Sequence, residues 1–303
     1  MLPYRFPEVS PTTLSASHPQ CVAYGAADRQ QTGARMNERL GRDEEDAHVR
    51  HPHGSGPTPP AWFRRFTPIP RPRTRLVCFP YAGGAASAFR TWPRHLPGTV
   101  ELLAVQYPGR QDRLQDPCVD DMDALAEPIV EALTPWLDRP LALFGHSMGA
   151  SVAFEVALRI EERHGVEPAA LFVSGREAPG HTRESALHEQ GDEALIADVL
   201  RLDEAAAPVL RDPDLRELVM GSIRADYRLS ETYRPRPHAS TGAPITAYVG
   251  RDDPDIDPAD IRAWSPHTRA GYSERIFPGD HFYLVPHEAE LIQDVAAKLN
   301  TAP

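Results

Sequence analysis

The sequence predicts an α/β fold, in which a mostly parallel β-sheet is flanked by helices and carries a helical insertion. From Trp62 onward, short apolar runs alternate with helical patterns, and this repetition is typical of parallel sheets covered on both faces. The runs are apolar throughout, as strands buried on two faces should be. One long helical stretch without strands, between Gly175 and Pro244, interrupts the alternation.

The elements are expected at definite places along the chain. Strands are expected at 76–79, 101–106, 141–144, 169–173, 245–249 and 273–277, and helices at 120–137, 148–163, 194–202, 215–227 and 287–299. Insertions at the carboxyl end of a parallel sheet usually cover the site there. We therefore expect a domain at 61–303 with a lid at about 176–235, in which apolar residues such as Leu195 line or shield a substrate chamber.

Residues 1–60 differ from the rest, because they are rich in Pro, Ser, Thr, His and Arg and show no sustained apolar period. Such a segment cannot bury enough apolar surface to offset the entropy of ordering it, so we expect it to be disordered. It has no apolar core after a basic start, which argues against a secretory signal.

The composition excludes several classes of function. A formal net charge of −11 argues against nucleic acid or an anionic membrane as a partner. The chain has no apolar stretch long enough to span a membrane. Three cysteines without CxxC spacing suggest neither a zinc site nor a disulfide framework, which suits a reducing cytoplasm. We expect a cytoplasmic monomer without metal or cofactor.

The strongest local motif is GHSMG at residues 145–149, which stands between an apolar strand and a helical run. This context is required of the nucleophile elbow of the α/β-hydrolase fold. Glycines two residues before and after Ser147 let strand and helix approach closely. The elbow then presents the hydroxyl of Ser147 above the sheet, at a helix N-terminus.

A serine hydroxyl needs a base that is oriented by a carboxylate, and in this fold the order is Ser, then Asp or Glu, then His. His281 lies in a loop between the last strand and the last helix, where the base should be. Asp253 follows the strand at 245–249 and is the favoured acid, with Asp252 as its rival. The candidate catalytic residues are therefore Ser147, Asp253 and His281.

The oxyanion of a tetrahedral intermediate requires two hydrogen-bond donors. One is expected to be the backbone N–H of Met148, directly after the nucleophile. The other should come from the turn after an early strand, where Ala82 precedes Gly83 and Gly84. The backbone N–H of Ala82 is our second candidate.

From Trp62 to Leu299 the sequence resembles type II thioesterases, the stand-alone editing enzymes of polyketide and nonribosomal-peptide assembly lines. The matching segments are FPYAGG at 79–84, YPGR at 107–110, GHSMG at 145–149, SGR at 174–176 and GDHF at 279–282. The resemblance implies a Ser147–Asp253–His281 triad and a mobile lid. It also implies a thioesterase that removes stalled or misprimed acyl groups from the phosphopantetheine arm of acyl or peptidyl carrier proteins.

Two departures from the family and several alternatives remain. The N-terminal extension is not expected, and Asp280 stands where many relatives have glycine. A carboxylesterase or lipase acting on oxygen esters would share the triad, and a cyclising thioesterase would pass the acyl group to an internal nucleophile. A non-catalytic scaffold that binds acyl carriers is a further alternative, which the intact Ser, Asp and His disfavour.

Overall fold

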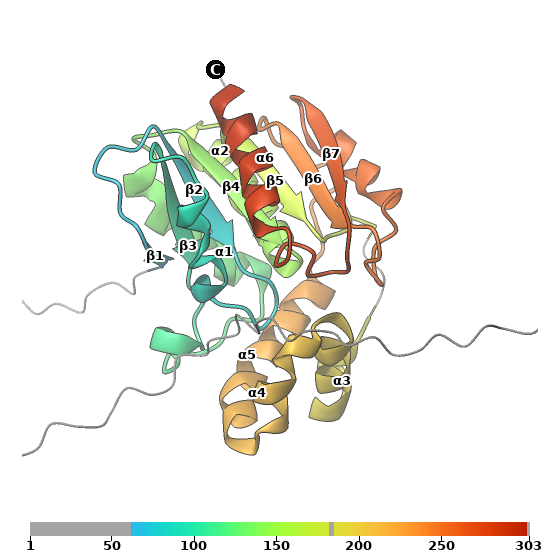
Figure 1. Cartoon of the computed structure of the whole chain (residues 1–303). Coiled ribbons are helices and arrows are strands. Elements are labelled where there is room, and N and C mark those ends of the chain that lie inside the picture. The colour runs from blue at the N-terminus through green and yellow to red at the C-terminus, as the bar shows by residue number, and fades with distance from the viewer. Residues whose placement is uncertain (1–61, 182–184, 302–303) are drawn as a thin grey trace, which may run out of the picture. The chain divides into compact units, whose positions relative to one another are not determined.

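The computed structural model describes residues 62–181 and 185–301 (Figure 1), so the expected N-terminal extension lies outside the described residues. Its strands form one seven-stranded sheet in the order β1-β3-β2-β4-β5-β6-β7. They are β1 (Phe63–Arg64), β2 (Thr74–Phe79), β3 (Val100–Val105), β4 (Leu141–His146), β5 (Ala170–Ser174), β6 (Ile245–Gly250) and β7 (Tyr272–Phe277). All neighbouring strands are parallel except β1 and β3.

Helices cover both faces of the sheet (Figure 1), as the sequence predicts. Helices α1 (Met122–Leu133) and α2 (Met148–His164) pack on one face, and α6 (Glu288–Thr301) packs on the other. The alternation of side chains along β4 explains the two cores, since Leu141 and Leu143 join the first and Ala142 and Phe144 join the second. The expected mostly parallel sheet flanked by helices is confirmed.

Two details differ from the sequence prediction. The short strand β1 is an additional antiparallel edge, with Phe63 opposite Val105, and two residues carry no periodicity that could reveal it. The helix expected at 120–137 ends at Leu133 and continues as a 3₁₀ turn, Thr134–Trp136. Pro135 explains this end, because a proline has no backbone N–H with which to continue the α-helical hydrogen bonds.

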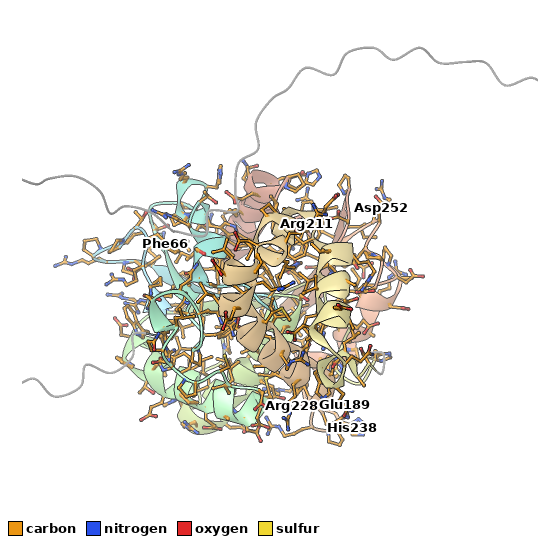
Figure 2. The ribbon with its side chains drawn as sticks, turned by 90° about the horizontal axis from the view of Figure 1, so that it is seen from below. Phe66, Glu189, Arg211, Arg228, His238 and Asp252 are labelled. Atoms are coloured by element: carbon orange, nitrogen blue, oxygen red, sulfur yellow. The ribbon has the colours of Figure 1, made fainter. Side chains whose placement is uncertain are left out.

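The insertion between β5 and β6 is helical. It contains α3 (Asp192–Leu202), α4 (Ala207–Arg211) and α5 (Pro213–Thr232). Asp212 begins α5, because its side chain accepts hydrogen bonds from the backbone N–H groups of residues 214 and 215. The three helices lie below the carboxyl end of the sheet in Figure 1 and cross the face that Figure 2 presents.

The helices of the insertion share a small apolar core of their own, formed by Leu195, Leu210, Met220 and Ile223. Leu195, which was expected to line or shield a substrate chamber, is fully buried in this core. Helix α5 also holds its neighbours through polar groups, since the hydroxyl of Tyr227 donates to Asp198 on α3 at 2.9 Å. The insertion is therefore a packed unit with α5 at its centre.

Within the described ranges, no helix is both long enough and apolar enough to cross a membrane.

Candidate active site

Ser147 stands in the sharp turn between β4 and α2, with φ 54° and ψ −123°. A positive φ is unfavourable for a residue with a side chain and persists only where the surroundings enforce it. Here closely packed backbone enforces it. A Cβ atom on Gly145 would overlap the carbonyl of Gly149, and one on Gly149 would overlap the carbonyl of Phe79. The motif thus forms the elbow that the sequence predicts.

The loops after β6 and β7 bring Asp253 and His281 together. The Nδ1 atom of His281 lies 2.8 Å from Oδ2 of Asp253. The other carboxylate oxygen of Asp253 accepts the backbone N–H of Asp255 at 3.0 Å. Both side chains are buried, with relative exposures of 5% for His281 and 0% for Asp253. The structure therefore pairs the favoured acid with the imidazole.

The rival acid points elsewhere. Asp252 is exposed and is labelled at the rim of the molecule in Figure 2. Its backbone N–H donates to the carbonyl of Gly279 at 2.9 Å, which ties the loop after β6 to the loop that carries His281. Asp252 thus helps to shape the turn through its backbone, while its side chain lies outside the site.

Ser147 and His281 come from loops that meet at the carboxyl edge of the sheet. The ring of His146, the residue before Ser147, lies 5.0 Å from the ring of His281 between centroids. Among the described residues, no hydrogen bond joins the Ser147 hydroxyl to His281. In ligand-free enzymes such catalytic hydrogen bonds are often long and tighten on substrate binding.

The two expected oxyanion donors lie on adjoining segments. Met148 is the first residue of α2, and Ala82 lies in the turn after β2. The close approach of Gly149 to the carbonyls of Phe79 and Pro80 holds these segments together. In the described part of the chain, neither Ala82 nor Met148 donates its backbone N–H to another group. Both donors are thus available to a ligand.

A buried polar chain beside His281 was not foreseen from the sequence. The Oγ atom of Ser174, at the end of β5, lies 2.9 Å from Nδ1 of His146 and 2.6 Å from the hydroxyl of Tyr283. Burial, reinforced by the neighbouring His281, lowers the pKa of His146 well below its usual range. His146 is therefore neutral at physiological pH.

Among the described residues, no group of three or more His, Cys, Asp or Glu side chains is arranged to hold a metal ion.

Comparisons with known proteins agree on one family. Residues 74–299 match the family model described as Thioesterase domain. Thioesterase PikA5 of Streptomyces venezuelae is 43% identical over 239 residues, which cover 78% of this chain and 85% of that protein.

Two solved structures extend the similarity to the fold. The type II thioesterase BorB from the borrelidin biosynthetic cluster is 40% identical with a TM-score of 0.74, over 79% of this chain and 98% of that one. The RedJ thioesterase from the prodiginine pathway of Streptomyces coelicolor is 36% identical with a TM-score of 0.71, over 77% and 90% of the two chains.

The acid assignment predicts opposite outcomes for two adjacent carboxylates. Asp253→Asn should lower kcat by about 10⁴-fold, as in other triads, because the imidazole loses its orienting carboxylate. Asp252→Asn, the matched control, should change kcat less than about threefold, since its side chain is exposed. Steady-state kinetics with a thioester substrate measures both, and a larger loss in the Asp252 variant would contradict the assignment.

The crowded surroundings of Gly149 and the open surroundings of Gly221 predict opposite changes in stability when each glycine is replaced by alanine. Gly149→Ala should lower the melting temperature and the activity, because the added methyl group would overlap the backbone of Phe79. Gly221→Ala, on an open surface of α5, should raise stability by about 0.5–1 kcal/mol, since alanine favours the helix. Thermal and chemical denaturation of both variants test this, and an unchanged stability of Gly149→Ala would refute the close contact.

Proposed function

The chain belongs to the thioesterase family and is thus a hydrolase that acts on thioesters; from this premise we propose its substrate and its mechanism. The proposed substrate is an acyl group held as a thioester on the phosphopantetheine arm of an acyl or peptidyl carrier protein. The proposed role is editing, the removal of stalled or misprimed acyl groups from a polyketide or nonribosomal peptide synthase. Ser147, His281 and Asp253 would form the catalytic triad.

One observation carries the mechanistic part of this proposal, the buried pair of His281 and Asp253 beside the elbow of Ser147. A carboxylate that accepts a hydrogen bond from Nδ1–H fixes the neutral tautomer of the imidazole. The Nε2 atom then carries the lone pair that can accept a proton from the serine hydroxyl. Asp253 also favours the imidazolium that forms when the proton is transferred.

The reaction would proceed in two halves. Oγ of Ser147 attacks the thioester carbonyl while His281 takes its proton, and the amides of Ala82 and Met148 bind the resulting oxyanion. Collapse breaks the C–S bond, the pantetheine thiol leaves with the proton from His281, and the acyl group stays on Ser147. Water then attacks this acyl ester with His281 as the base, which releases a carboxylic acid and restores Ser147.

The carrier-bound substrate is supported by the relatives. BorB is described as a type II thioesterase of the borrelidin cluster, and RedJ as a thioesterase of the prodiginine pathway. Polyketide and nonribosomal peptide synthases hold their intermediates as carrier-bound thioesters. The helical insertion over the carboxyl edge of the sheet suits such a substrate, because a lid can enclose an acyl chain while the carrier remains outside.

The proposal predicts a preference among matched substrates. With one acyl group presented as a carrier-protein thioester, as a CoA thioester and as an oxygen ester, kcat/KM should be highest for the carrier-bound form. A phosphonate directed at activated serines should add one label per chain, at Ser147. Ser147→Ala should abolish labelling and lower kcat by at least about a thousandfold.

Ser151→Ala is the matched control, because Ser151 lies one turn further along α2 and is buried; it should leave labelling intact. Faster hydrolysis of the oxygen ester than of either thioester would contradict the proposed substrate. Labelling at another residue would contradict the proposed nucleophile.

A further inference from the structure

A buried ion pair links the helical insertion to a loop of the core. Arg110 follows β3, and its guanidinium donates two hydrogen bonds to Asp226 of α5, at 2.6 Å to Oδ2 and 2.8 Å to Oδ1. The two residues are 6% and 1% exposed. They are 116 positions apart in the sequence, so the pair is a tertiary contact between the insertion and the sheet.

Both partners of this pair also hold the turn after β2. The backbone N–H of Gly83 donates to Oδ2 of Asp226 at 2.7 Å. The carbonyl of Gly84 accepts a hydrogen bond from Nη1 of Arg110 at 3.0 Å. One turn earlier on α5, Ile223 lies so close to Gly83 that a Cβ atom there would be 3.1 Å from its Cγ1 atom. The two residues directly after Ala82 are thus fixed from α5 and from Arg110.

The form of these contacts suits positioning better than stabilisation. Replacing a buried ion pair by apolar residues is often neutral or stabilising for a fold, because the charges must leave water. Hydrogen bonds to a carboxylate are directional, however, and fix the groups that donate them. By accepting the Gly83 N–H, Asp226 fixes the residue directly after Ala82, the expected oxyanion donor.

We propose that Asp226 and Arg110 are positioning residues that hold the amide of Ala82 where it can bind the oxyanion. This inference rests on the proposed function, since it assigns a role in the same reaction. Its consequence is that α5 has to be seated on the core before the oxyanion site is complete. The helix would thus cover the site and also support its chemistry.

The first test replaces the carboxylate by its neutral isostere. Asp226→Asn should lower kcat by about a hundredfold, the loss typical of one oxyanion donor, with KM changed less than about threefold. Asp214→Asn is the matched control, because Asp214 is exposed in the first turn of the same helix; it should keep the wild-type kcat. A wild-type kcat in folded Asp226→Asn would overturn the proposal.

A second measurement separates positioning from a general loss of structure. An alkylboronic acid forms a tetrahedral adduct with a catalytic serine and should bind more weakly to Asp226→Asn, in proportion to the fall in kcat/KM. A thioether-linked alkyl-pantetheine lacks the thioester carbonyl, and its Kd should change less than about twofold. Equal weakening of both ligands would mean a distorted pocket and would overturn the proposal.

The double variant Arg110→Met/Asp226→Leu completes the test. Its melting temperature should equal or exceed that of Asp226→Asn, because no buried charge is left unpaired. Its kcat should stay low, because an apolar pair cannot orient the Gly83 amide. Recovery of both stability and kcat would show that the pair only stabilises the fold.

If the proposed function itself is wrong, the result differs from a failure of the positioning role. In that case the wild-type protein itself would neither hydrolyse carrier thioesters nor label at Ser147. An active wild type with active variants would refute the positioning role alone.

Discussion

The first turn of α2 lies against the ends of β4 and β2 so closely that neither Gly145 nor Gly149 has room for a methyl group. This contact forces Ser147 into its strained conformation and places the first amide of the helix beside the turn after β2. The nucleophile candidate and both oxyanion-donor candidates thus belong to one rigid backbone unit. The parallel sheet provides the frame, because β2 and β4 are neighbours in it and end at the same edge.

The site around this unit is assembled from loops that follow different strands. The carboxylate of Asp253 is buried beside His281, while burial lowers the pKa of the adjacent His146. His146 is therefore neutral at physiological pH. The hydroxyl of Ser174 lies within hydrogen-bonding distance of both Tyr283 and His146, so these buried side chains have polar partners.

Local sequence was sufficient for the six parallel strands and for the candidate triad, because Ser147, Asp253 and His281 each follow a predicted strand in the order that the fold requires. It could not reveal the pairing of Arg110 with Asp226. Arg110 lies within a motif, but Asp226 is one of several acidic residues on α5, and only the packed helix shows which one faces the core. The same holds for Tyr283, whose hydrogen-bond partner Ser174 lies 109 positions away at the end of β5. It also holds for β1, which is too short for any periodicity.

Because Asp226 is part of α5, the boundary between the core and an exchangeable cover does not lie at the ends of the insertion. A chimera that takes residues 192–211 from a relative would exchange α3 and α4 and leave α5 with its contact to Gly83. A graft that extends through residue 232 would also replace the partner of Arg110. A junction at Asp212, the residue before α5, therefore separates the exchangeable helices from the one that contacts the core.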